Sequence, residues 1–317
     1  MDEFIKTAEQ RRLMEKIYAL IPVFQKREPE LDALRSFPYK NIEDLKRIDY
    51  HTLTLPKEYG GQGFGLYEFI LAQEAISKGC GSTGLSIGWH TGTVLEFAEN
   101  RHWNEEPAEW LLDEIRKGAL INSAASETNA GSPTRGALPK TTAVVDGDEL
   151  IINGEKTYTS MAPVLDYFLV TVTNEKGEVQ SVIVPRDAKG VSIDEDWDML
   201  SMRGTASHTL VLKDVRVPKS YVLKDGDNLK AKAKGWLLHI PACYIGIAGA
   251  ARDYALRFAT SYVPLSLGKP IAEAPNIRQL IGEIEFELRK ARHLLYSTVE
   301  RYEQADNKEE VADVLSI

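Results

Sequence analysis

The spacing of hydrophobic positions changes twice along this chain. In the first third, apolar residues such as Leu13 and Ile17 recur at helical intervals. The pattern then becomes a series of short β-branched runs, and helical spacing returns in the last third. The sequence therefore predicts an all-α domain, a central β-domain and a C-terminal helical domain, over residues 1–119, 120–228 and 229–317.

Capping and turn residues indicate where individual helices begin and end. Asn41 is placed to cap a helix over 42–48, and a second helix is expected over 107–117. The stretch 79–84 has G-x-G-x-x-G spacing, but it follows a helical pattern rather than a strand. It therefore indicates a helix stop followed by a helix start. Two long C-terminal helices are expected, over 236–262 and 277–304.

The central region consists of short β-rich runs that are separated by turn signals such as Asp146-Gly147 and Asn153-Gly154. No helical pattern lies between the runs, so they favour a small antiparallel β-barrel or sandwich over a parallel nucleotide-binding sheet. The fold class is thus α+β and multidomain, with an incomplete helical bundle at the C-terminus. The expected strands cover 142–145, 149–152, 167–173, 179–184 and 209–215.

Composition excludes several kinds of function. The net charge of −9 argues against a nucleic-acid binder, because there is no excess of Lys and Arg to offset phosphates. No run approaches the roughly 18 apolar residues of a membrane span. The two cysteines, Cys80 and Cys243, are too few for a zinc site or a disulfide framework, and no histidines have metal-binding spacing. The N-terminus lacks a signal-peptide pattern, so a cytoplasmic location is expected.

The densest group of candidate binding residues lies where the helical pattern gives way to the β pattern. Residues 121–132 read I-N-S-A-A-S-E-T-N-A-G-S, a short strand-like run followed by small and polar residues. Such residues leave backbone N–H groups and hydroxyls available to a ligand. A site at this junction can be walled by both the helical and the β-domain.

Four segments of the chain resemble the acyl-CoA dehydrogenase superfamily. They are L-P-K-E-Y-G-G-Q-G at 55–63, S-E-T-N-A-G-S at 126–132, the stretch 141–160 that ends in G-E-K-T-Y-T-S, and the stretch 197–218 that begins W-D-M-L-S-M-R-G-T-A-S, in the family's order. The helix expected around 245–248 is also similar to that of the family's C-terminal domain. The resemblance implies FAD, held between the central β-domain and the helical domains. It also implies dehydrogenation of an acyl-CoA or related small-molecule substrate, an electron-transfer acceptor protein, and assembly as a homodimer or homotetramer.

The resemblance also implies which residues surround the flavin. Ser123, Ala125 and Ser126 would lie along its pyrimidine side, Ser160 would approach N5, and Tyr158 would pack on the ring face. This set suits the chemistry, because a reduced isoalloxazine is stabilised by polar groups near N5, O4 and O2 and by a flat aromatic wall.

Further residues complete the implied site. Ser132 would sit near the substrate tail or the flavin phosphates. Arg203, Thr205 and Ser207 match the family's R-x-S/T-x-S/T segment and would line the same cavity. Each hydroxyl alone could merely cap a strand end, and it is the joint spacing that favours a site.

The sequence assigns no catalytic base. The family commonly supplies a Glu late in the C-terminal domain, which is expected to lie beyond Ile317, and its alternative location falls near Trp236, which cannot act as a base. Glu96, Glu99 and Glu127 are the first carboxylates to test.

Three interpretations therefore stay open. The first is a truncated dehydrogenase, which the ending inside a helical pattern favours and which would reduce flavin slowly. The second is a member of the flavin monooxygenases and oxidases that share the fold. The third is a non-catalytic flavin-binding or assembly protein.

Overall fold

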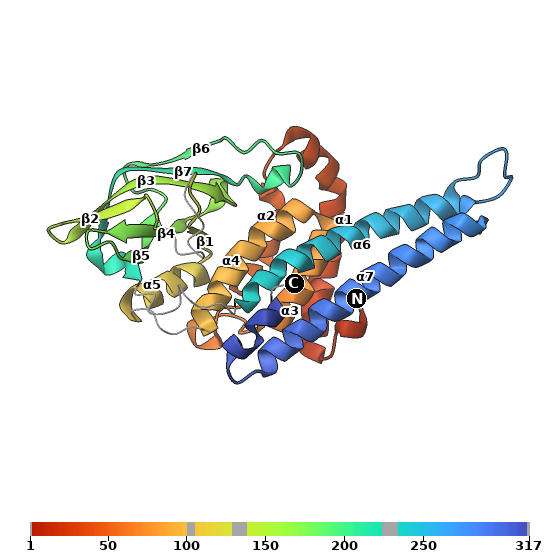
Figure 1. Ribbon diagram of the computed structural model, residues 1–317, viewed down its shortest axis with the longest axis horizontal. Coiled ribbons are helices and arrows are strands. Elements are labelled where there is room, and N and C mark those ends of the chain that lie inside the picture. The colour runs from red at the N-terminus through yellow and green to blue at the C-terminus, as the bar shows by residue number, and fades with distance from the viewer. Residues whose placement is uncertain (1, 100–104, 129–137, 224–233, 316–317) are drawn as a thin grey trace.

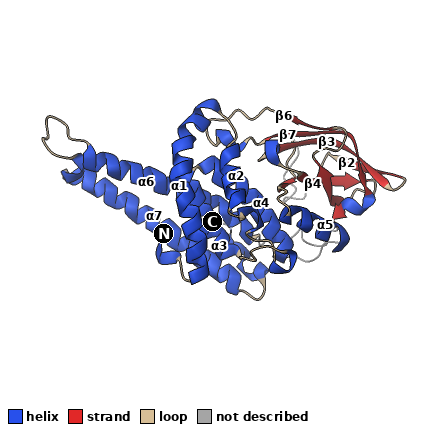
Figure 2. Cartoon of the chain, turned by 180° about the vertical axis from the view of Figure 1, so that it is seen from behind, coloured by secondary structure: helices blue, strands red, loops and turns tan. Residues whose placement is uncertain are grey.

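The computed structural model describes residues 2–99, 105–128, 138–223 and 234–315. It confirms the predicted three-part architecture, with a helical N-terminal part, a central sheet and a C-terminal helical hairpin (Figures 1 and 2). The sheet packs against one side of the helices, and the hairpin extends away from the opposite side (Figure 1).

The N-terminal helices follow the apolar pattern, although two of them begin earlier than predicted. The helix expected over 107–117 begins at Glu105. The helix that was assigned to an Asn41 cap begins at Tyr39, and Asn41 is buried within it, where its side chain donates to Thr83 Oγ1 at 2.9 Å. The predicted stop and start at 79–84 is confirmed, because one helix ends at Gly79 and the next begins at Gly81. The helices are α1 (Ala8–Leu34), α2 (Tyr39–Arg47), α3 (Leu66–Gly79), α4 (Gly81–Glu99) and α5 (Glu105–Arg116).

The central sheet is mixed and open rather than purely antiparallel and closed. Its strand order is β6-β7-β3-β2-β4-β5-β8, and β4 pairs in parallel with both β1 and β2. The sequence pattern indicated that no helices separate the strands. It gave no information on strand direction, so the parallel pairing of β1 and β2 with β4 was not predicted. The strands are β1 (Ile121–Ala124), β2 (Thr142–Asp146), β3 (Glu149–Thr159), β4 (Tyr167–Asn174), β5 (Val179–Pro185), β6 (Val191–Asp194), β7 (His208–Pro218) and β8 (Val222–Leu223).

The Asn153-Gly154 pair, predicted as a turn, is instead a bulge inside β3. The pairing of β3 with β7 shifts register there, and Gly154 adopts a φ of 151°. A Cβ at Gly154 would lie 2.4 Å from the hydroxyl of Thr141, so only glycine fits. Asn153 and Asp214 hydrogen-bond to each other across the bulge. Because the strand continues through the bulge, it reaches Thr159 and delivers the residues that follow to the candidate site.

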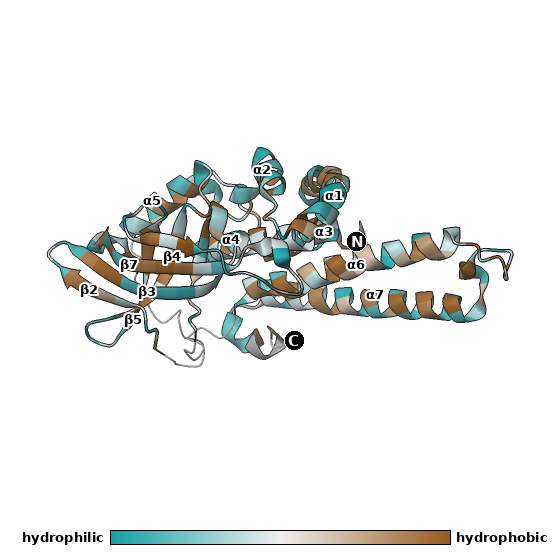
Figure 3. Ribbon diagram, turned by 90° about the horizontal axis from the view of Figure 1, so that it is seen from above, coloured by the Kyte–Doolittle hydropathy of each residue, from teal (hydrophilic) through white to brown (hydrophobic). Residues whose placement is uncertain are grey.

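The C-terminal part is a hairpin of α6 (His239–Ser261) and α7 (Pro275–Gln304), preceded by a short 3-10 turn at Gly235–Leu238 and followed by another at Lys308–Leu315. The two helices run side by side and carry apolar patches along their length (Figure 3). Within the described ranges, no helix is both long and apolar enough to span a membrane.

Candidate functional site

Three of the predicted site residues meet at the end of the β3–β7 pairing. Ser160 directly follows β3, Ser207 directly precedes β7, and Thr205 lies in a 3-10 turn just before it. Ser160 Oγ lies 2.8 Å from Ser207 Oγ, which lies 2.8 Å from Thr205 Oγ1, and Thr205 donates to the carbonyl of Met202 at 3.0 Å. We refer to this series, from Ser160 through Ser207 and Thr205 to the Met202 carbonyl, as the hydroxyl chain.

The backbone around the hydroxyl chain is strained. Tyr158, Met161, Met202 and Ala206 all have positive φ, between 44° and 65°. Such a conformation costs a non-glycine residue about 1 kcal/mol or more, and it persists only where surrounding contacts enforce it. One of these contacts is the amide of Met161, which donates to the carbonyl of Thr205 at 3.0 Å. The concentration of strain here is typical of a functional site.

The end of β1 is hydrogen-bonded to the same region. The side chain of Asn122 donates to the carbonyl of Ser160 at 3.0 Å, and the amide of Thr157 donates to the carbonyl of Ser126 at 2.9 Å. Ser123 and Ser126 have exposed side chains, and Ala125 is half-buried between them. Asn122 was not among the predicted site residues. It lies in the junction stretch that was singled out, but its apolar neighbours suggested only a strand.

Aromatic side chains flank the exposed part of the site. Tyr158 is 61% exposed although it is a large side chain, and the ring of Trp197 meets it edge-on with centroids 6.1 Å apart. The indole of Trp197 donates to the carbonyl of Met202 at 3.1 Å, so its position is coupled to the hydroxyl chain. Trp197 lies in one of the segments that resemble the family, but the sequence alone predicts no role for it.

Arg203 is directed away from the hydroxyl chain, toward the N-terminal helices. Its guanidinium forms a two-pronged ion pair with Asp32 in α1, with one N–O distance of 3.1 Å. The hydrogen bond from Arg203 lowers the pKa of Asp32 below its ordinary value. Arg203 therefore joins the sheet to the helical domain. The remaining predicted residue, Ser132, lies outside the described residues.

Glu127 is held in a buried ion pair and is not poised to act as a base. Its carboxylate contacts Lys156 Nζ at 2.6 Å, and the two side chains are 4% and 0% exposed. It also accepts from the Thr141 hydroxyl and from the amides of Lys140 and Thr141. Burial acts to raise the pKa of Glu127, but the hydrogen bond from Lys156, together with those from Thr141 and Lys140, outweighs it and lowers the pKa to about 2. The carboxylate is thus permanently ionised at neutral pH, with its oxygens occupied.

The other two carboxylates considered as bases contact the C-terminal part of the chain. Glu96 pairs with Lys234 at 3.3 Å, and Glu99 accepts from the Tyr302 hydroxyl at 3.4 Å. Neither contact involves the hydroxyl chain. In the ranges that the structure describes, no three His, Cys, Asp or Glu side chains come together as a metal site.

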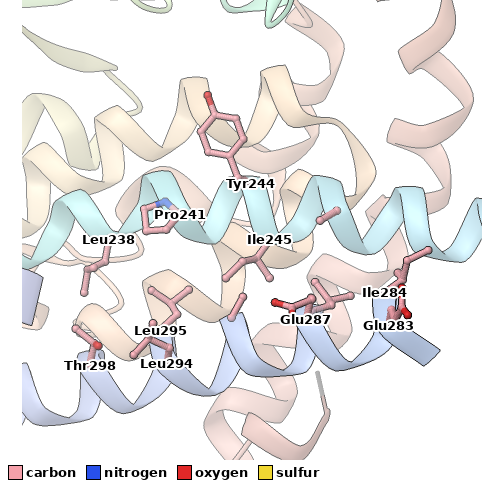
Figure 4. Close-up of a pocket in the computed structure, with 13 residues that line it drawn as sticks. Leu238, Pro241, Tyr244, Ile245, Glu283, Ile284, Glu287, Leu294, Leu295 and Thr298 are labelled. Carbon is pink, nitrogen blue, oxygen red and sulfur yellow. The ribbon is translucent and has the colours of Figure 1, made fainter. Parts of the chain in front are cut away.

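A separate apolar groove of about 820 Å³ lies between α6 and α7 (Figure 4). Aliphatic side chains dominate its walls, and two glutamates from α7 lie at one end (Figure 4). None of its lining residues belongs to the sheet, so the groove is distinct from the hydroxyl chain. The labelled lining residues are Leu238, Pro241, Tyr244, Ile245, Glu283, Ile284, Glu287, Leu294, Leu295 and Thr298.

The chain matches known proteins along nearly its whole length. Residues 7–116, 122–215 and 238–316 match the N-terminal, middle and C-terminal domains of acyl-CoA dehydrogenases. The Bacillus subtilis (strain 168) protein YdbM, which bears the name of an acyl-CoA dehydrogenase, is 43% identical over 305 residues, covering 96% of this chain and 80% of that protein.

Solved structures share the fold at lower sequence identity. Butyryl-CoA dehydrogenase from Megasphaera elsdenii superposes with a TM-score of 0.86 at 19% identity, covering 98% of this chain and 83% of that one. TdsC from Paenibacillus sp. A11-2, solved with FMN and indole, gives 0.82 at 24% identity, covering 96% and 78%. At these identities the likeness supports the fold alone. The sequence matches support the predicted flavin cofactor, and the chain belongs to the acyl-CoA dehydrogenase family of flavoprotein oxidoreductases.

Proposed function

We propose that this chain is an FAD-dependent oxidoreductase that removes hydrogen from the α and β carbons of an acyl-CoA thioester. The observation that carries this proposal is the match to all three domains of acyl-CoA dehydrogenases, together with a cluster of hydroxyls where the family resemblance places the flavin ring. When bound, the flavin supplies the acceptor for the hydride. An electron-transfer protein is the proposed acceptor of the electrons in turn.

The residues at the site suit an isoalloxazine ring. Tyr158 offers an exposed aromatic face, and Ser160 brings a hydroxyl to the end of β3. The amide oxygen of Asn122 is buried and has no partner among the described residues, although its amide nitrogen is bonded. A flat ring edged with donors and acceptors fits a site that combines these groups. We propose that Ser123, Ala125 and Ser126 contact the pyrimidine side of the ring.

The structure narrows the search for the base that would remove the α-proton. Glu127 is not assigned this role, because its oxygens are occupied by Lys156, Lys140 and Thr141. Glu96 and Glu99 keep partners in the C-terminal part of the chain, so neither is assigned this role.

Flavin retention is the first expected result. Protein purified with FAD present should keep its flavin absorbance through desalting, which micromolar affinity, or about 8 kcal/mol, would achieve. Tyr158→Ala should weaken this retention, whereas Tyr39→Ala, which removes an exposed tyrosine from α2, should not. A colourless wild-type protein with native circular dichroism would overturn the flavin assignment.

The reaction itself is tested by anaerobic mixing of the flavin-loaded protein with a panel of acyl-CoA thioesters. Bleaching of the flavin by one of them supports the proposal and identifies the acyl group. No bleaching, combined with oxygen uptake once an external reductase supplies reduced flavin, would transfer the protein to the monooxygenase interpretation.

Self-association is a further expected property. The C-terminal hairpin exposes large apolar side chains, including Tyr254 and Phe258 on α6 and Leu280 and Phe286 on α7. Exposed apolar patches of this kind commonly mark protein interfaces. We predict a dimer or tetramer in sedimentation velocity at micromolar concentration, and Phe286→Lys should shift the distribution toward the monomer. A wild-type protein that sediments as a monomer at high concentration would contradict this.

A further inference from the structure

We infer that the hydroxyl chain has a fixed direction, in which Ser160 donates its only hydrogen to Ser207 and so presents lone pairs to a bound flavin. The site would then favour the reduced flavin, whose N5 carries a hydrogen, over the oxidised flavin, whose N5 carries a lone pair. This inference rests on the proposed function, because the family resemblance is what places Ser160 beside N5.

The direction follows from counting hydrogens. Each hydroxyl has one hydrogen to donate, whereas a backbone carbonyl can only accept. Thr205 Oγ1 lies 3.0 Å from the carbonyl of Met202, so its hydrogen is used there. With that hydrogen used, the arrangement with the most hydrogen bonds has Ser207 donating in its 2.8 Å contact with Thr205, and Ser160 donating in its 2.8 Å contact with Ser207.

Reversal of the chain is possible but loses one hydrogen bond. In the reversed direction Thr205 donates to Ser207 and Ser207 to Ser160, and the bond to the Met202 carbonyl is broken. In the forward direction that carbonyl accepts from the Thr205 hydroxyl together with the amide of Thr205 and the indole of Trp197, so the three donors share two lone pairs. Reversal therefore costs one shared bond and leaves the carbonyl satisfied. Thr205 is fully buried and Ser207 nearly so, which leaves little access for water to replace the lost bond. One such bond corresponds to about a tenfold preference for the forward direction.

The same count predicts the preference between flavin states. With a reduced flavin, the forward chain keeps its three bonds and Ser160 accepts a fourth from N5–H. With an oxidised flavin, Ser160 can donate to N5 only if one bond of the chain is given up, so three bonds is the maximum. The reduced flavin therefore makes one hydrogen bond more than the oxidised flavin, which corresponds to about tenfold tighter binding of the reduced form.

Ser207 and Thr205 are thus positioning residues that set the orientation of the Ser160 hydrogen. In Thr205→Val, Ser207 loses the Thr205 hydroxyl as an acceptor, so it can donate its hydrogen to Ser160 instead. Ser160 can then donate its own hydrogen to N5 of an oxidised flavin. In Ser207→Ala, the Ser160 hydroxyl rotates freely. Both variants should lose the tenfold preference, and the midpoint potential of the two-electron couple should fall by about 30 mV.

The experiment is an anaerobic redox titration of the flavin-loaded wild type and variants. Thr205→Ser keeps the hydroxyl and should restore the wild-type potential. Thr159→Val is the matched control, because it removes a neighbouring buried hydroxyl that donates to the backbone carbonyl of Lys156 and takes no part in the hydroxyl chain. Unchanged or higher potentials in both Thr205→Val and Ser207→Ala would overturn the inference.

A second measurement does not depend on the flavin. Neutron diffraction from deuterium-exchanged protein should show the deuterium between Ser160 and Ser207 bonded to Ser160, and the deuterium on Thr205 directed at Met202. A deuterium on Ser207 that points at Ser160 would refute the direction. If wild-type protein takes up no flavin, the proposed function fails while the neutron result still decides the direction of the chain.

Discussion

Replacing Lys156 with Met should lower the free energy of unfolding by about 3–5 kcal/mol, because removal of one partner strands a buried charge. Glu127 is 4% exposed, and its carboxylate lies 2.6 Å from Lys156 Nζ. In the variant the carboxylate keeps its bonds to Lys140 and Thr141 but has no counter-charge. Urea denaturation at pH 7, followed by far-UV circular dichroism, measures the loss.

Two variants control this experiment. Lys117→Met removes an exposed lysine of the same type, which lies 2.8 Å from Glu114 on the surface, and it should leave the denaturation midpoint unchanged. The double variant Lys156→Met/Glu127→Leu removes both charges and should recover much of the stability. If Lys156→Met denatures at the same urea concentration as Lys117→Met, the ion pair does not stabilise the fold as proposed.

The pair also makes stability depend on pH in a defined direction. The pKa of Glu127 is about 2 in the folded protein, below its ordinary value of 4.5. The unfolded state therefore binds more protons between these pH values, and the contribution of Glu127 is complete above about pH 4.5 and is lost as the pH falls toward 2. Wild type should weaken over this interval more steeply than the double variant does.

This ion pair shows what the sequence could and could not provide. Both residues lie in segments that carry the family resemblance, S-E-T-N-A-G-S and G-E-K-T-Y-T-S, so the segments were located correctly. The sequence did not show that they meet, because contact across 29 residues depends on the sheet register. Because the contact with Lys156 is not visible in the sequence, Glu127 was one of several carboxylates that could be considered as the base.

Contacts between segments that are distant in sequence were likewise not predictable in the sheet or in the candidate site. Short runs rich in β-branched and aromatic residues located β2, β4 and β5 closely, because such residues favour strands, whereas β7 extends to Pro218, past the predicted 209–215. The parallel pairing of β1 with β4 has no local signal, since it joins residues 121–124 to 167–170. The hydroxyls of Ser160 and Ser207 were both identified as site residues, but their contact depends on the pairing of β3 with β7, which has no local signal in the sequence.

Asn153-Gly154 illustrates a signal with two physical meanings. An Asn-Gly pair between β-rich runs favours a hairpin turn, because both residues tolerate positive φ. Here the same tolerance forms a bulge within β3, where Gly154 lies against Thr141. The choice between turn and bulge is made by the packing of a neighbouring strand, which the local sequence does not encode.

The second large effect is expected where the C-terminal hairpin joins the N-terminal helices. Arg292 in α7 contacts Glu74 in α3 at 2.6 Å, and the Tyr296 hydroxyl donates to the same carboxylate at 2.9 Å. Both charged side chains are almost fully buried. Arg292→Met leaves Glu74 charged, buried and held by Tyr296 alone, so a loss of about 3–5 kcal/mol is expected. Tyr296→Phe removes one hydrogen bond to a charged group and should cost about 1.5–3 kcal/mol.

The location of the loss separates this pair from a general packing defect. Glu74 and Arg292 join two helices that are far apart in sequence, so breaking their bond should release α7 from α3 before the sheet unfolds. Hydrogen exchange in Arg292→Met should therefore accelerate in α6 and α7 while β4 and β5 keep their protection. Arg289→Met, which breaks an exposed pair with Glu285 on the same helix, is the matched control and should leave exchange unchanged. Equal acceleration in the sheet and the hairpin would show that the two parts unfold as one unit, and that Arg292 does not act as the specific link between them.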